Sequence, residues 1–504
     1  MSVLPYAPAG MSNFEDALLK TGWGLYSKFL VGFTASCFFA NAMAFMSLHI
    51  YMPLITCDIA MSENTILNIH VSTSLGMAFG GFFLSSTSDV VGRKGIISLS
   101  LMFVFIGALA SSFTFGIFTI MFAQFALGTG LVANWNVTKI LLIEVLPIYK
   151  RSKSIIFLDI FARLGTIVAV LISFSCMPVV IEYRGSSARL VSWRLLYGFT
   201  GFISVFTACV SALILESPRY LVYENRPAQA IFILSEIFAI NKSKLATGYP
   251  LTDVDLQGKI ANFGINTERD IPHTFSSRRC FIILKRVRKS MIILMTKQFC
   301  GSIMLCSILK LATCLGLFLL MMMLTKTMVY NDACLLDGMN WLHFEHPLYR
   351  DCKDYNVDIS MYRDFLVLAS VSVVGHVMTI VFVSYVDRKY LVFSGLFLSG
   401  LLMLSLSFIG SSYTARFVIS CVAVIGFATA DSALNVLTIE MFPTAIRGTS
   451  LGEIEILKHV AVTLLERFMV VQCKWIFVVF AALLEVGAIF SLALPKLKKR
   501  ALYD

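Results

Sequence analysis

The chain has 504 residues, of which 58% are hydrophobic and 14% are charged, and its formal net charge is +11. A water-soluble globular protein is about a quarter charged, because its surface must face water, so this composition excludes that class. The apolar runs are long enough to cross a bilayer as helices, which takes about 20 residues. Since these runs do not alternate apolar and polar residues, we predict an all-α integral membrane protein.

The chain begins with a polar segment, residues 1–28, which we expect to lie in the cytosol. Residues 1–13 carry no basic region in front of an apolar core, so we expect no cleavable signal peptide. The first apolar run then acts as its own insertion signal.

Twelve apolar runs follow in chain order, and each is predicted to be a transmembrane helix. They are 29–52, 66–86, 95–113, 116–143, 153–177, 194–215, 307–329, 365–386, 390–410, 414–438, 450–472 and 475–494. The runs form two sets of six. The predicted domains are the N-terminal half 29–215, the central loop 216–290, the C-terminal half 291–494 and a basic tail, 495–504.

The central loop 216–290 is the longest polar stretch, with twelve Lys and Arg against seven Asp and Glu. Asn225 and Pro227 predict the start of a helix. Its apolar face carries Ile231, Leu234, Ile237 and Phe238. This helix is expected on the membrane surface or under the transmembrane bundle. The loop is also a candidate binding segment for a cytosolic partner.

Basic residues gather in alternate loops, as the positive-inside rule requires. Arg93, Lys150, the central loop, Arg388 and the C-terminal tail fall on one side, whereas loop 330–363 on the other side is acidic. Both termini are therefore predicted to be cytosolic. The plasma membrane and an intracellular vesicle membrane both fit this pattern. The loop placement of the charge does not indicate nucleic-acid binding.

The twelve cysteines lie mostly inside apolar runs and show no zinc-binding spacing, so no metal site is predicted. Cys334 and Cys352 share the acidic loop 330–363. A disulfide and two free thiols are both consistent with that placement.

The sequence repeats itself between the two halves. Residues 143–154 and 439–450 both read I-E-x-x-P-x-x-x-R-x-x-S, each after the fourth run of its half. The segments that begin at Asp89 and Asp387 form an earlier pair, which precedes Glu144 by 55 positions and Glu440 by 53. Two related motifs in one order indicate two parallel, pseudo-symmetric six-helix halves with a solute path between them.

These motif residues are predicted to form a gate at the cytosolic edge. Gly92 permits a tight turn between Asp89 and Arg93, and Glu144 and Arg151 are expected to pair with that turn. Ion pairs there could hold one face closed and break when the halves rock. The alternative is that the charges only set topology. The second-half members of this gate set are Asp387, Arg388, Glu440 and Arg447.

At these residues the chain resembles the major facilitator superfamily. Residues 88–94 (SDVVGRK) are similar to its signature loop, and residues 216–221 (ESPRYL), with Glu216 and Arg219, are similar to a sequence of sugar and organic-ion porters. More narrowly, residues 14–24 and 192–194 resemble the synaptic vesicle glycoprotein 2 and related-protein group. The resemblance implies the twelve-helix major facilitator fold and transport.

The resemblance also implies an acidic pair in the first helix, in a stretch that reads Asn41-Ala42-Met43-Ala44 here. Both carboxylates of that pair are therefore absent. This departure motivates a rival interpretation, in which the protein keeps the fold but only binds or regulates.

Ionisable and polar residues within the runs are the candidates for the solute or a coupling ion, because charge in a membrane is costly. Asp431 is the first candidate, with Asn435 one turn later. Lys139 could bind an anion or neutralise Asp431, whereas Asp159 and Arg163 are expected to pair with each other. Glu455 and His459 either neutralise each other or line a wet cavity. The remaining candidates are Asn41 and Trp135.

We therefore predict a secondary carrier that moves a small organic solute by alternating access. Transport with a coupling ion and transport without one both fit the sequence. The solute is expected among the first, fourth, fifth, seventh, tenth and eleventh helices. No nucleophile, phosphate loop or cofactor motif is visible, so an enzyme is not predicted.

Overall fold

The computed structural model describes residues 14–59, 63–114, 116–176, 180–182, 189–250, 277–329, 359–409, 413–468 and 473–496. Each of the twelve predicted runs falls on a helix in these ranges. The N-terminal half contains α2 (Leu25–Asp58), α3 (Glu63–Val91), α4 (Arg93–Ser112), α5 (Ile117–Val145), α6 (Ile148–Cys176) and α7 (Ser192–Val210). The C-terminal half contains α11 (Cys300–Val329), α12 (Ile359–Phe382), α13 (Arg388–Leu406), α14 (Tyr413–Met441), α15 (Arg447–Phe468) and α16 (Cys473–Ser491).

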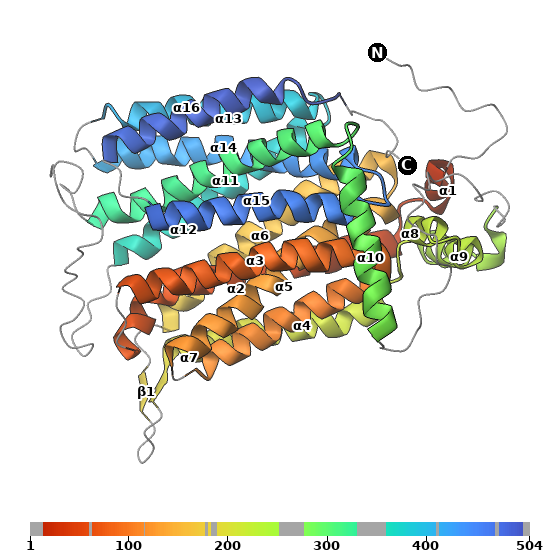
Figure 1. Ribbon diagram of the computed structural model, residues 1–504, viewed down its shortest axis with the longest axis horizontal. Coiled ribbons are helices and arrows are strands. Elements are labelled where there is room, and N and C mark those ends of the chain that lie inside the picture. The colour runs from red at the N-terminus through yellow and green to blue at the C-terminus, as the bar shows by residue number, and fades with distance from the viewer. Residues whose placement is uncertain are drawn as a thin grey trace.

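Shorter elements complete the described chain. They are α1 (Phe14–Thr21), α8 (Pro218–Tyr223), α9 (Pro227–Lys242), α10 (Ser277–Leu294), the 3₁₀ turns η1 (Ser211–Leu213) and η2 (Ala246–Gly248), and the antiparallel strands β1 (Val180–Glu182) and β2 (Arg189–Val191). Helices α1, α8, α9 and α10 lie at one end of the bundle, which we call the α1 end; the β1–β2 pair lies at the other (Figure 1). Helix α10 runs across the bundle axis (Figure 1).

Ten helices in the described ranges are long and apolar enough to cross a membrane. Two predicted spans, α15 and α16, fall outside that set. The described apolar part of α16 is short, Phe477–Ser491. Helix α15 is too polar, because Glu453, Glu455 and Lys458 interrupt it.

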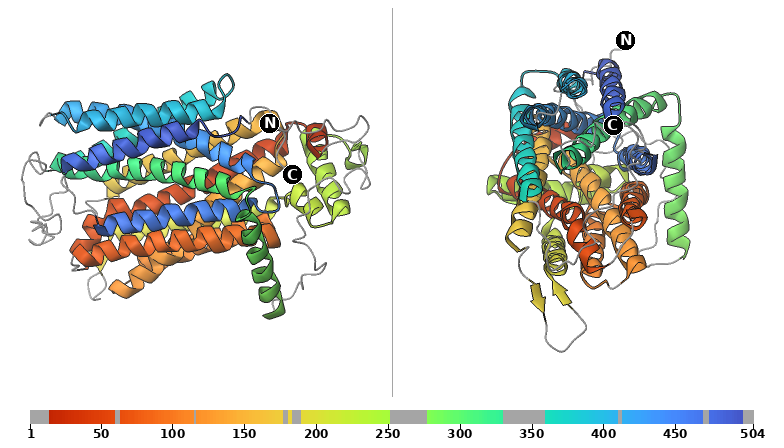
Figure 2. Two further views of the ribbon diagram at one scale, coloured as in Figure 1. Left: turned by 45° about the horizontal axis from the view of Figure 1, so that its top comes forward. Right: turned by 90° about the vertical axis from the view of Figure 1, so that its left-hand side faces the viewer.

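The two halves meet along two pairs of long helices, α3 with α15 and α6 with α12. Figure 1 shows α15 beside α3 although 350 or more residues separate them in the chain, and the end-on view in Figure 2 shows the helices gathered into one bundle. The hydrophobic core of the C-terminal half is built on residues such as Phe427, Leu434 and Leu484.

The helix predicted in the central loop is present as α9. Its apolar face is buried through Leu234, Ile237 and Phe238, and it packs against Phe14 and Tyr220 of α1 and α8. Helix α9 therefore packs on α1 and α8 at the α1 end of the bundle. Pro at the first helical turn fits this start, because its missing N–H would have no helical partner there.

Glycines allow the helices to approach closely at the interface between the halves. A Cβ atom added at Gly452 of α15 would lie 2.4 Å from the backbone oxygen of Gly81 on α3. That separation is far below van der Waals contact, so any side chain there forces the two backbones apart.

We expect Gly452→Ala to destabilise the protein by about 1–3 kcal/mol, the usual cost of overpacking. Gly32→Ala is the matched control, because nothing lies within 4 Å of a Cβ at that helical position. Thermal unfolding of the two detergent-solubilised variants measures the difference. Equal unfolding temperatures would contradict the close packing of α3 on α15.

Candidate functional site

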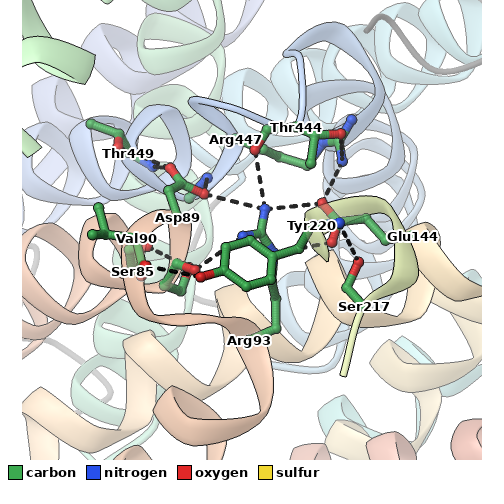
Figure 3. A network of polar contacts seen from close by, with 12 residues as sticks. Ser85, Asp89, Val90, Arg93, Glu144, Ser217, Tyr220, Thr444, Arg447 and Thr449 are labelled. Atoms are coloured by element: carbon green, nitrogen blue, oxygen red, sulfur yellow. Dashed lines mark hydrogen bonds and ion pairs between the residues drawn. The ribbon is translucent and has the colours of Figure 1, made fainter. Parts of the chain in front are cut away.

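A buried polar network joins the halves at the α1 end (Figure 3). Its first part is the turn between α3 and α4. Gly92 has φ = 112°, a backbone conformation that side chains disfavour, and it lets the chain reverse between Asp89 and Arg93. Both of these side chains are buried.

Glu144, at the end of α5, binds two arginines. Arg93 Nε donates to Glu144 Oε2 at 3.0 Å, and Arg447 Nη1 donates to Glu144 Oε1 at 2.7 Å. All three side chains are essentially inaccessible to water. Because Arg447 belongs to the C-terminal half and the other two to the N-terminal half, this carboxylate is an ion-pair bridge between them.

Asp89 makes the second link between the halves. It accepts hydrogen bonds from the backbone N–H groups of Gly448 at 3.0 Å and Thr449 at 2.8 Å, and from the Thr449 hydroxyl at 3.0 Å. These groups form the N-terminal turn of α15. A carboxylate there satisfies free N–H groups and faces the positive end of the helix dipole.

Glu216 stabilises the turn at Gly92 and the first residues of α4. Its carboxylate accepts from the backbone N–H groups of Arg93 at 2.9 Å and of Lys94. Burial raises the pKa of the Glu216 carboxyl above its ordinary value, against the hydrogen bonds that it accepts. Glu216 thereby fixes where α4 begins.

The equivalent network of the C-terminal half is different. Arg388 pairs with Glu440, as Arg93 does with Glu144, and its Nη2 also donates to Ser152 Oγ of the N-terminal half at 2.6 Å. Asp387 precedes α13 without capping it through its side chain.

Arg151 does not join the turn at Asp89, contrary to the sequence prediction. Its guanidinium forms a two-point contact with Glu15 of α1, at 2.8 and 2.7 Å. Arg219 donates to the same carboxylate at 2.7 Å and lies over the ring of Phe14. Glu15 was not selected in the sequence analysis. It binds Arg151 because α1 lies at the same end of the bundle as the start of α6.

A second polar group lies deeper, between the halves. Lys310 Nζ of α11 donates to Asp431 Oδ1 at 2.7 Å and to Asn435 Oδ1 at 2.6 Å. Lys139 Nζ approaches the same Asn435 oxygen at 3.4 Å. Lys310 is therefore the ion-pair partner of Asp431, a role that the sequence analysis gave to Lys139 as one of two alternatives. The signal for Lys310 was present, since it is a charged residue within an apolar run.

Asp159 and Arg163 do not pair, contrary to the sequence prediction. Asp159 Oδ2 accepts from Ser432 Oγ at 3.0 Å, and the same hydroxyl lies 2.6 Å from His376 Nδ1. Asp159 instead turns toward the C-terminal half. The buried Nε of Arg163 has no hydrogen-bond partner in the described residues.

The remaining candidates divide into two places. On α15, Glu455 pairs with Lys458 and lies 3.2 Å from His459 Nε2. On α2, Asn41 Nδ2 donates to Asn134 Oδ1 at 2.8 Å, and Trp135 contacts Phe45 edge-on. Cys334 and Cys352 lie outside the described residues.

The comparisons with known proteins agree with this architecture. The profile of the Major Facilitator Superfamily matches residues 34–465, which is most of the chain. The chain belongs to the Major Facilitator Superfamily. As a member it is a multi-pass membrane protein of a superfamily of secondary transporters, and it is not an enzyme.

Its relatives within the Major Facilitator Superfamily are distant. The chain is 23% identical to organic cation/carnitine transporter 7 of Arabidopsis thaliana, over 87% of this chain and 84% of that protein. It is 24% identical to synaptic vesicle glycoprotein 2A of Homo sapiens, over 47% of this chain and 32% of that protein. The predicted resemblance to this group is thereby confirmed.

Solved structures share the fold. The proton:xylose symporter XylE bound to 6-bromo-6-deoxy-D-glucose aligns with a TM-score of 0.65 at 15% identity, over 95% of this chain and 97% of that one. A partially occluded inward-open form of the xylose transporter XylE from E. coli aligns with a TM-score of 0.60 at 14% identity, over 95% and 99%. The predicted major facilitator fold is confirmed.

Glu144→Gln is expected to destabilise this superfamily member by about 3–5 kcal/mol, because it leaves two buried guanidinium groups without their counter-charge. Glu236→Gln is the control, since Glu236 is only half-buried on α9 and outside the network. Thermal unfolding in detergent checks both variants. A Glu144→Gln protein as stable as the control would show that Glu144 does not hold the halves together.

Glu15→Gln is expected to loosen α1, because the neutral amide binds Arg151 and Arg219 more weakly than a carboxylate does. Hydrogen exchange of the α1 amides should accelerate about tenfold, which corresponds to roughly 1.4 kcal/mol. Asp16→Asn is the matched control on the exposed side of the same helix. Unchanged exchange in Glu15→Gln would mean that the apolar contacts of α1 suffice.

Proposed function

We propose that the protein carries a small organic solute by alternating access and binds it at the central polar group. This group consists of Lys139, Asp159, Lys310, Asp431 and Asn435. The carrying observation is that its members come from α5, α6, α11 and α14, hence from both halves. Lys139 and Lys310 both donate to Asn435, and Asp159 accepts from Ser432, the neighbour of Asp431 on α14. A solute held there contacts both halves, so their rocking would change its surroundings.

The network at the α1 end supplies the gate in this proposal. Its links across the halves are the Arg447–Glu144 ion pair and the hydrogen bonds from α15 to Asp89. They can exist only while the halves are close at that end. Opening this end therefore requires these bonds to break. A solute that binds the open conformation more tightly than the closed one would supply the free energy for that opening.

Loop charge supports the proposed orientation. The basic loops named above include Arg93, Arg388 and the central loop, and Arg93 and Arg388 both lie in the polar networks at the α1 end. Under the positive-inside rule this end faces the cytosol, and both termini with it. The domain division at 215–216 and 290–291, and a partner for the central loop, belong to the same proposal.

A non-transporting binding protein is the rival function. The observation that favours it is that Asn41 and Ala44 stand where the family resemblance implies an acidic pair. Asn41 instead makes a neutral hydrogen bond to Asn134 of α5. A transporter requires a titratable or ion-binding carboxylate only if it couples transport to an ion. The missing carboxylates of α2 therefore argue against ion coupling at α2 more than they argue against transport.

The carrier proposal is tested by measuring solute uptake in a single variant and in a double variant that removes both charges of the Lys310–Asp431 ion pair. The solute is chosen as the compound that most raises the unfolding temperature, from a panel of organic cations, anions, sugars and nucleosides. Asp431→Asn alone should lower both uptake and stability, because Lys310 is left unpaired. The double variant Lys310→Gln/Asp431→Asn should recover the stability and still lack uptake.

Wild-type uptake by the folded double variant would remove the central polar group from the proposed mechanism. A solute that stabilises the wild-type protein but is not taken up into proteoliposomes would favour the rival binding function. A Lys244→Met protein, altered at an exposed loop position, serves as the control for handling.

A further inference from the structure

Helix α10 is basic and amphipathic. Its 18 residues, Ser277–Leu294, include six Lys and Arg and no Asp or Glu, and large apolar side chains stand between the charges. It is not among the described helices that are apolar enough to cross a membrane. This composition is typical of a helix that lies in the plane of a membrane surface.

The inner face of α10 is fixed to the bundle. Ile282, Val287 and Ser290 are buried, and the helix packs on α3 and α15. Arg286 is also buried and forms an ion pair with Glu224, at the end of α8, at 3.2 Å. Because these contacts hold α10 in place, the protein itself determines which side of the helix faces outward.

The outer face of α10 presents large apolar side chains. The four most prominent, each between 59% and 67% exposed, are Phe281, Leu284, Ile292 and, just after the helix, Met295. Phe281 and Ile292 are about three helical turns apart and therefore lie on the same side. Apolar side chains gathered in this way indicate that an apolar medium or partner covers this face.

Basic side chains share this outer face. Lys285 and Arg288 are exposed, and Lys289 is half-buried. Since Lys and Arg have long apolar stems, a helix can place its apolar side chains in lipid while the charged ends of its basic side chains reach the headgroups. Apolar and basic side chains on one face therefore fit the surface of a bilayer that carries negative charge.

The orientation of α10 also favours a bilayer over a soluble acidic protein. The helix runs across the bundle axis at the α1 end (Figure 1), and the end-on view in Figure 2 places it on the flank of the bundle beside α15 and α3. A helix perpendicular to the transmembrane helices lies parallel to the membrane surface. Because the bundle occupies its inner face, a soluble protein cannot enclose α10 as it would a free basic helix.

We propose that the outer face of α10 binds anionic lipids of the membrane surface. Phe281 and Ile292 insert between the lipid headgroups, and the basic side chains Lys285, Arg288 and Lys289 bind the lipid phosphates. Anionic lipids are concentrated in the cytosolic leaflet, where the proposed orientation places the α1 end. The interaction is separate from solute binding, because these residues lie outside the central polar group.

Lipid titration of the full-length protein in detergent tests the proposal. The anionic dioleoylphosphatidylglycerol should raise the unfolding temperature by about 2 °C or more, whereas the net neutral dioleoylphosphatidylcholine should raise it less. High salt should weaken the effect, because it screens exposed charges.

A charge-removal variant and a matched control locate the effect on α10. In the triple variant Lys285→Gln/Arg288→Gln/Lys289→Gln, the phosphatidylglycerol concentration that gives half the effect should rise about tenfold or more. The control removes the same charge from exposed positions at the two ends of α9, as Arg226→Gln/Lys242→Gln/Lys244→Gln. It should respond to the lipid as the wild-type protein does.

A second measurement tests insertion without changing any charge, and it remains available if the triple variant does not fold. In lipid nanodiscs, hydrogen exchange of the α10 amides should be slower with phosphatidylglycerol present than with phosphatidylcholine alone. Phe281→Gln should reduce this difference, whereas Leu245→Gln, at an exposed position after α9, should leave it unchanged.

Four results would overturn the proposal. One is a phosphatidylglycerol response of the α10 triple variant equal to that of the wild-type protein, and another is equal stabilisation by the two lipids. Stabilisation by soluble glycerol phosphate to the same extent would indicate a phosphate site in place of a membrane surface. Stabilisation by polyglutamate but by neither lipid would indicate an acidic protein partner. The carrier proposal is tested separately by uptake.

Discussion

One carboxylate, that of Glu144, balances two arginines that belong to different halves of the protein. In a low-dielectric interior such charges are tolerated only when they are paired, so Arg93 and Arg447 must both stay near Glu144 or find other partners. The turn at Gly92 and the contact of Glu216 with the start of α4 position Arg93 near Glu144. The hydrogen bonds from the start of α15 to Asp89 position Arg447 near the same carboxylate. The closeness of the halves at the α1 end follows from it.

The sequence repeat does not produce equal halves. Arg447 and Arg151 occupy equivalent places in the repeated motif, yet Arg447 crosses to Glu144 whereas Arg151 turns to Glu15 of α1. The equivalent of Glu144, which is Glu440, binds Arg388 of its own half. Helix α1, which lies outside the repeat, therefore binds Arg151 and leaves Arg447 as the arginine that links the halves. The two halves have similar motifs in sequence but different ion pairs in the structure.

The sequence predicted local properties well and partners less well. Long apolar runs fix the helices, and the spacing of Gly92 and Arg93 marks a turn, because both depend on neighbouring residues. The partners of Asp431, Asp159 and Arg151 were missed, since each contact joins residues 121 or more positions apart. Charge alone could not distinguish Lys139 from Lys310 as the base beside Asp431, whereas the geometry of α11 against α14 does.

Helix α15 has a consequence for how the protein is made. Its Glu455–Lys458 ion pair lies within the helix, but its N-terminal N–H groups donate to Asp89 of α3, so part of what stabilises this helix exists only in the finished bundle. During synthesis its charged residues make it a weak substrate for the translocon. We therefore expect its integration to depend on α3, which is synthesised long before it and packs along it in the bundle. Defects in the Asp89 turn should accordingly appear as failed biogenesis as well as altered gating.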